Sequence, residues 1–454
     1  MATVFVVLGV GLLVIAFASA RAPDSRLVRC ARSRLVLVPL ALVLLPAFAV
    51  AHAAGYLAAV MLSHGLAVLL AALEIGCLLG AAALAVRRPS ARALARRTAI
   101  SVLFAGSLLY VGLVTWLWRP PSEAACSSSS RPGTVDLLTP PELPGELSDP
   151  YDILYVPQRQ LVLVTFKSAG NGTLDFWLEP AGNRFFVIDV ADPDRPRHAS
   201  IPLPGPALPQ YMTWDPARQE VVLSRLGYGK HSLAVVGVGD FPNLHLARSV
   251  PIDYEPHSMI LSPDGRSVGC FKVQCALVMH DRETFQPQGE IEVPGGMVVL
   301  DAWQAPGAAR VYVSMMGPSV AELDLGTGAV RLAAVPFGGG QLTAVPERRQ
   351  IFETDIVRHA INVIDMDGMS LVRTVGLDYT PRSVRADVAR DLLLVTDWFG
   401  GRLVLYRLST LAELASTPVA PHLRNIAYDS ERGLVFATSK CGVMQVRVDA
   451  ITGR

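Results

Sequence analysis

Imidazole, guanidinium, ammonium and carboxylate side chains recur at comparable positions beside short apolar segments after residue 150. Groups of these kinds bind ions and exchange protons. We predict a ligand-binding set of His257, Arg382, His422, Asp355, Asp397, Trp398 and Lys440. A hard metal ion requires several oxygen ligands, and only Asp355 and Asp397 occupy suitable positions, on neighbouring segments. We therefore predict no metal site and no cofactor, and we assign no catalytic residue.

The elements that carry these residues form a repeat. Seven times after residue 150, a turn rich in Pro, Asp and Arg leads into a short apolar segment that ends in a small polar residue. These terminal residues are Thr165, Ser224, Cys270, Ser314, Thr354, Thr396 and Thr438. Short strands that repeat every ~40–45 residues are typical of β-propeller blades. We predict seven blades, which begin near residues 150, 207, 254, 297, 341, 381 and 422.

The last repeat has only three predicted strands before Arg454, which would leave an unpaired sheet edge. Proteins avoid such edges because they expose unbonded backbone groups. Residues 133–140 have the pattern of a fourth strand, and we predict that they close the ring by pairing with the last blade. The all-β, seven-bladed propeller domain then covers residues 133–454.

The third repeat carries the clearest motif. Glu255-Pro256-His257-Ser258 opens its innermost strand, and Ser262-Pro263-Asp264-Gly265 makes its first hairpin. This pattern resembles the YVTN-type, lactonase-like seven-bladed propellers of bacteria. Partial matches are Thr380-Pro381-Arg382, Ala420-Pro421-His422, Leu208-Pro209-Gln210 and Asp149-Pro150-Tyr151. The resemblance implies the architecture and leaves the activity open.

In propellers of this kind the innermost strands begin on the face to which the loops between second and third strands return. An inner ring is expected there from Tyr151, Gln210, His257, Gln341, Arg382 and His422. An outer ring is expected from Lys167, Arg225, Lys230, His231, Lys272, Asp355, Arg358, His359, Asp397, Trp398, Arg402 and Lys440. We predict a polar, partly cationic cup with Trp177 and Trp398 as apolar anchors. The alternative is a face of ordinary solvated loop residues.

Four apolar stretches precede the repeats, at residues 3–20, 35–53, 56–86 and 98–118. Each is long enough to cross a hydrocarbon core of ~30 Å. The two segments between the first and second and between the third and fourth stretches are rich in Arg, as cytoplasmic loops are. We predict a four-helix transmembrane bundle over residues 1–118, with the N-terminus and everything after residue 118 outside the cytoplasm. The alternative for residues 1–20 is a cleaved signal peptide.

Residues 119–132 are rich in Pro and Ser and are expected to form an extended linker. A fourth strand runs toward the face that carries the cup. We therefore expect the linker to join the propeller on the opposite face, so that the cup points away from the bilayer.

Four cysteines lie in the part predicted to be extracytoplasmic, where disulfides form. They are Cys126, Cys270, Cys275 and Cys441. Cys270 and Cys275 flank a predicted hairpin, and we predict a disulfide between them.

The charge of the chain is unevenly distributed. The segment up to residue 124 has a net charge of +8, from eleven Arg against Asp24, Glu74 and Glu123, whereas the whole chain has +1. The residues after 124 therefore carry a net charge of about −7. A mildly acidic domain is not expected to bind nucleic acid, because phosphate binding requires a basic surface.

Together these features predict an integral protein of a bacterial inner membrane. Its periplasmic propeller is expected to bind a small soluble ligand or an envelope protein, without catalysis of its own. Two alternatives are a lactonase-like or quinoprotein-like enzyme and a structural cap subunit on a membrane complex.

Overall fold

The computed structural model describes Cys126 and residues 133–138, 150–166, 184–205, 207–226 and 231–453. All of them belong to a compact unit that begins at Pro120. The four apolar stretches predicted to cross the membrane lie outside the described residues. Within the described part, no helix is long and apolar enough to cross a bilayer.

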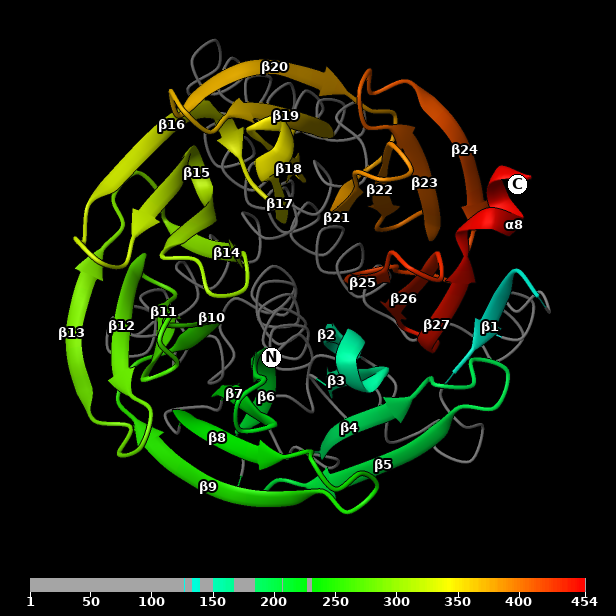
Figure 1. The fold of residues 1–454 in the computed structure, drawn as a ribbon. Coiled ribbons are helices and arrows are strands. Elements are labelled where there is room, and N and C mark those ends of the chain that lie inside the picture. Colours follow the sequence, from blue (N-terminus) through cyan, green and yellow to red (C-terminus); the bar gives the residue numbers. More distant parts are fainter. Residues whose placement is uncertain are drawn as a thin grey trace, which may run out of the picture. The chain divides into compact units, whose positions relative to one another are not determined.

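Seven antiparallel sheets form a ring, each with one strand near the axis and one at the rim (Figure 1). Blade 1 contains β2 (Pro150–Val156), β3 (Leu161–Phe166), β4 (Arg184–Asp189) and β5 (Arg197–Pro202). Blade 2 contains β6 (Leu208–Asp215), β7 (Glu220–Leu226), β8 (His231–Gly237) and β9 (His245–Ile252). Blade 3 contains β10 (Pro256–Leu261), β11 (Ser267–Lys272), β12 (Ala276–Asp281) and β13 (Pro287–Glu292).

The ring continues with blade 4, which contains β14 (Val298–Gln304), β15 (Arg310–Asp324) and β16 (Val330–Gly338). Blade 5 contains β17 (Leu342–Val345), β18 (Gln350–Asp355), β19 (Ala360–Asp365) and β20 (Ser370–Gly376). Blade 6 contains β21 (Pro381–Asp387), β22 (Leu392–Asp397), β23 (Arg402–Arg407) and β24 (Glu413–Pro418). Blade 7 contains β25 (Ile426–Asp429), β26 (Leu434–Ser439), β27 (Gly442–Arg447) and β1 (Val135–Leu137). The predicted seven-bladed propeller is confirmed.

The last blade takes its outermost strand from the N-terminal side of the propeller (Figure 1). β1 pairs antiparallel with β27, with Val135 opposite Val446 and Leu137 opposite Met444. This is the pairing that we predicted for residues 133–140. The short helix α8 (Val448–Thr452) follows β27 directly.

Blade 4 differs from the others because β15 supplies both its second and its third strand. Residues Val311–Met316 of β15 pair with β14, and residues Gly317–Leu323 pair with β16. Pro318 lies just after the change of partner, where a missing N–H is tolerated. We expected a loop between the second and third strands of every blade, and blade 4 has a continuous strand at that position.

The hydrophobic core is itself a ring. Seven clusters of buried apolar side chains each join two neighbouring blades, and the one between blades 7 and 1 completes the circuit. Strands β3, β22 and β26 are buried along their whole length, which explains their continuous apolar sequences. Burial on both faces requires such sequences. Each blade therefore depends on both of its neighbours.

Candidate functional site

The small polar residues at the ends of the second strands organise the axis of the ring. At the start of five of the innermost strands, one N–H bonds to the hydroxyl that lies thirteen residues later. The bonded N–H groups belong to Asp152, Tyr211, Gln341, Ser383 and Asn425, and their acceptors are Thr165, Ser224, Thr354, Thr396 and Thr438 at 2.8–3.1 Å. A backbone donor that the sheet leaves unpaired is thereby satisfied.

Three of these hydroxyls also reach the next blade. Thr165 Oγ1 donates to the carbonyl oxygen of Gln210 at 2.6 Å, Thr354 Oγ1 to that of Arg382 at 3.0 Å, and Thr396 Oγ1 to that of Arg424 at 3.4 Å. The repeated threonines therefore hold the residues that open the next innermost strand.

Two tyrosines and a histidine from blades 1 to 3 form a chain of hydrogen bonds near the axis. The hydroxyls of Tyr151 and Tyr211 lie 2.8 Å apart, and the Tyr211 hydroxyl lies 2.8 Å from Nε2 of His257. Both tyrosines are buried. Burial and the neighbouring Tyr151 raise the pKa of Tyr211 well above its usual value, so its phenol stays protonated.

Two arginines complete this group, which we call the axial cluster: Tyr151, Tyr211, His257, Arg382 and Arg424. Each arginine is only 8% exposed. The guanidinium of Arg424 lies 4.1 Å from the ring centre of Tyr151, and that of Arg382 lies 5.1 Å from the ring centre of Trp398. Burial, and then the charge of Arg424, lowers the pKa of Arg382.

Arg382 is the unusual member of the axial cluster. Its Nε is buried without a hydrogen-bond partner, and no described carboxylate forms an ion pair with this side chain. A buried cation normally has a partner that offsets its desolvation. Arg382 is therefore the side chain best suited to receive an anion.

Two carboxyl groups lie next to the cluster along the axis. Asp152 Oδ2 accepts from the N–H of Met212 and Asp301 Oδ2 from the N–H of Leu342, both at 3.2 Å. Burial, and then the charge of Asp301, raises the pKa of Asp152 to about 7. Burial raises the pKa of Asp301 to about 6. At pH 7, Asp152 is therefore about half protonated, whereas Asp301 is mostly ionised.

Side-chain hydrogen bonds connect three blades near the axis. Gln341 Nε2 donates to Asn425 Oδ1 at 3.0 Å, and Asn425 Nδ2 donates to Asp152 Oδ1 at 3.4 Å. These contacts fix Asp152 beside the axial cluster.

The structure places the predicted carboxylates in turns. Asp355 Oδ1 accepts the N–H groups of Val357 and Arg358 at 3.0 and 2.8 Å. Asp397 accepts from the N–H of Gly400 and from Arg402 Nε, both at 2.9 Å. Both carboxylates are buried and stabilise their own loops. Among the described residues, no three His, Cys, Asp or Glu side chains form a potential metal site.

The predicted cup is only partly assembled from the outer ring. Arg225 is buried and donates to the carbonyl oxygens of Pro204 and Ala207, and Lys272 Nζ lies 2.6 Å from Glu290. Both cations are thus engaged by neighbouring groups of the propeller. Lys167, Lys230 and Trp177 lie outside the described residues.

His422 and Lys440 lie beside Arg424. His422 is half-buried, and its ring packs edge-on against Phe399 at 5.7 Å. Burial, and then the charges of Lys440 and Arg424, lowers the pKa of His422 to about 4. His422 is therefore neutral at pH 7, while the positive charges around it favour an anion.

The predicted ligand-binding set includes His257 and Arg382 of the axial cluster, but it does not include Tyr211, Arg424 or the two axial carboxylates. A constant spacing along the sequence locates most of these axial residues. Counting thirteen residues back from each small polar residue gives the axial positions Asp152, Tyr211, His257, Asp301, Gln341, Ser383 and Asn425. The residue before each of the last two is an arginine of the axial cluster.

The predicted disulfide between Cys270 and Cys275 is not formed, since both thiols are free and buried. Cys270 packs between blades 2 and 3, whereas Cys275 packs between blades 3 and 4. The two side chains therefore lie on opposite faces of blade 3 and cannot meet.

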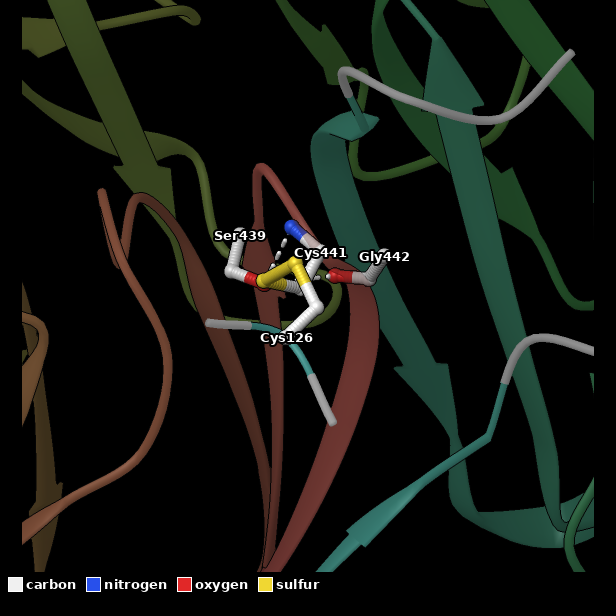
Figure 2. Close-up of a disulfide and its surroundings, with 4 residues drawn as sticks. All are labelled: Cys126, Ser439, Cys441 and Gly442. Carbon is white, nitrogen blue, oxygen red and sulfur yellow. Dashed lines mark hydrogen bonds between the residues drawn. A yellow bond between two sulfur atoms is a disulfide. The ribbon is translucent and has the colours of Figure 1, made fainter. Parts of the chain in front are cut away.

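A disulfide joins Cys126 to Cys441 instead, with their Cα atoms 5.3 Å apart (Figure 2). Cys441 lies in the turn between β26 and β27, where its N–H donates to Ser439 Oγ at 3.1 Å. This turn is on the face where the innermost strands begin, which we call the upper face. The strand that follows the linker, β1, begins on the opposite face, as expected. The disulfide in addition fixes Cys126 of the linker to the upper face, which was not expected.

Neither a family model nor a curated protein matches this chain. The fold defines it as a seven-bladed β-propeller protein, and the axial cluster is its candidate binding site.

Proposed function

We propose that this chain is a membrane-anchored, extracytoplasmic binding protein whose propeller takes a ligand with an anionic group at the axial cluster. The observation that carries the proposal is the buried guanidinium of Arg382, which has an unbonded Nε and lies next to a second buried arginine. Guanidinium groups bind carboxylates and phosphates through paired hydrogen bonds.

The surroundings of the two arginines support the same ligand class. Two buried arginines repel each other, which destabilises the folded protein. An anion bound between them offsets this repulsion. The aromatic rings of Tyr151 and Trp398 lie against the guanidiniums and offer apolar surface to the rest of the ligand.

Binding is favoured over catalysis because Asp355 and Asp397 are engaged by their own turns. The membrane anchor is proposed from the four apolar stretches before residue 119 and their flanking Arg clusters. Kinship with the YVTN-type, lactonase-like propellers is proposed from the opening motifs of the repeats, and supports an extracytoplasmic location.

Mass spectrometry of small molecules released from the detergent-purified full chain tests this function. We expect the wild type to release a carboxylate or phosphate compound that Arg382→Gln carries at least ~10-fold less, because one charge-assisted pair is lost. Arg266→Gln is the matched control, since Arg266 is highly exposed in a hairpin turn. Equal amounts of the same anions in all three folded proteins would refute the proposal.

A further inference from the structure

A cavity of about 470 Å³ lies at the other end of the ring axis from the axial cluster. Its lining comes from the last residues of the innermost strands β2, β14, β17, β21 and β25 and from the turns that follow them. The innermost strands begin at the upper face, so this cavity opens toward the lower face. Small-molecule sites typically measure ~300–1,000 Å³.

The walls of this cavity expose polar and apolar groups in about equal measure, and three of the lining residues are aromatic. Tyr155, Trp303 and Tyr428 line it together with aliphatic side chains of the strand ends. The hydroxyl of Tyr155 donates to Asp429 at 2.8 Å, and that of Tyr428 donates to Asp387 at 2.7 Å. Both tyrosines are thereby fixed in position, which makes the cavity a preformed site.

Arg385 is the cationic group of the cavity lining. Its Nη1 donates to the carbonyl oxygen of Val384 at 2.7 Å, and no described carboxylate forms an ion pair with it. Asp152 and Asp301 from the axis interact electrostatically with Arg385, and Glu347 is the acidic residue of the lining. Burial raises the pKa of both aspartates, so that Asp152 loses its charge as the pH falls through about 7 and Asp301 as it falls through about 6.

We infer that this cavity, the lower pocket, binds a flat, largely aromatic small molecule that carries one carboxylate, with Arg385 as its anion partner. The aromatic walls take the ring system, and the guanidinium pairs with the acid group. This is a second site, separate from the axial cluster.

Calorimetric titration of the detergent-purified full chain tests the inference, with naphthalene-2-carboxylate as the probe and naphthalene-2-carboxamide as its uncharged match. A blank titration into detergent removes the partition heat. We expect Arg385→Gln to weaken carboxylate binding at least ~10-fold and to leave carboxamide binding within about twofold, because only the acid group loses its partner.

A pair of charge variants at the rim sharpens this test. Val388 lines the pocket and is 39% exposed, so its substitution should cost little stability. We expect Val388→Glu to weaken and Val388→Lys to strengthen carboxylate binding, each by severalfold. Arg382→Gln should bind the probe as the wild type does, which separates this site from the axial cluster.

Three outcomes overturn the inference. They are the absence of saturable carboxylate binding to the wild type, equal affinities of the wild type and Arg385→Gln, and loss of probe binding in Arg382→Gln. Circular dichroism must show that each variant is folded.

Discussion

Glu353 shows how a buried acid ties the stability of this propeller to pH. It lies fully buried in β18 and accepts hydrogen bonds from Ser314 Oγ at 2.5 Å and from Asn362 Nδ2 at 3.1 Å. Burial raises the pKa of Glu353 from 4.5 to about 7. The folded protein therefore keeps a proton that the unfolded chain releases between these values.

This difference predicts that stability falls as pH rises from about 4.5 to about 7, because the folded state binds more protons there. We expect Glu353→Gln to remove part of that loss, since glutamine carries no charge, can accept from Asn362 Nδ2 through its oxygen and can donate from its NH2 group to Ser314 Oγ. At pH 8 the variant should be more stable than the wild type by on the order of 2 kcal/mol. Denaturant unfolding at pH 5 and pH 8 measures this, and an unchanged pH dependence would contradict it.

The residue types of the site could be predicted, but not their partners. His257 and Arg382 stand at the openings of innermost strands, which the repeat locates. Arg225 looks equally available in the sequence, yet it is buried against two carbonyl oxygens. The pairing of Cys126 with Cys441 depends on how the chain returns to blade 7, which no local spacing reveals.

The innermost and second strands together position the residues near the axis. A hydroxyl at the end of the second strand satisfies the irregular start of its own innermost strand and often holds the next one as well. The repeated small polar residue, visible in the sequence, thus has a positioning role that only the structure explains. At Cys270 the same position carries a thiol, which is a weaker acceptor.

Thr396→Val tests this positioning role. Thr396 Oγ1 accepts the N–H of Ser383 at 2.8 Å and donates to the carbonyl oxygen of Arg424 at 3.4 Å. Valine has the same shape but leaves a buried N–H unpaired, which should cost about 1–3 kcal/mol in the free energy of unfolding. Chemical denaturation measures the loss. Thr417→Val, in the outermost strand of the same blade, is the control, and equal effects of the two substitutions would refute the role.

At the scale of the whole molecule, the propeller is a closed circuit of seven blades. The number of blades, their limits and the closing strand were predictable because each follows from the repeat and from the avoidance of open edges. The continuous strand β15 was not predictable, because the sequence around Gly317 has the composition of a loop. Closure brings residues from blades 1, 2, 3, 6 and 7 to one place, which is why no single motif encodes the axial cluster.

Titration of inorganic phosphate into the full chain at low ionic strength tests the central claim most directly. The claim is that the axial cluster of this closed ring binds an anion through Arg382 and Arg424. The wild type and Arg266→Gln should bind phosphate with equal affinity, and Arg382→Gln should bind at least ~10-fold more weakly, since one charge-assisted pair is lost. Phosphate affinity that is the same in folded Arg382→Gln and in the wild type would contradict the claim.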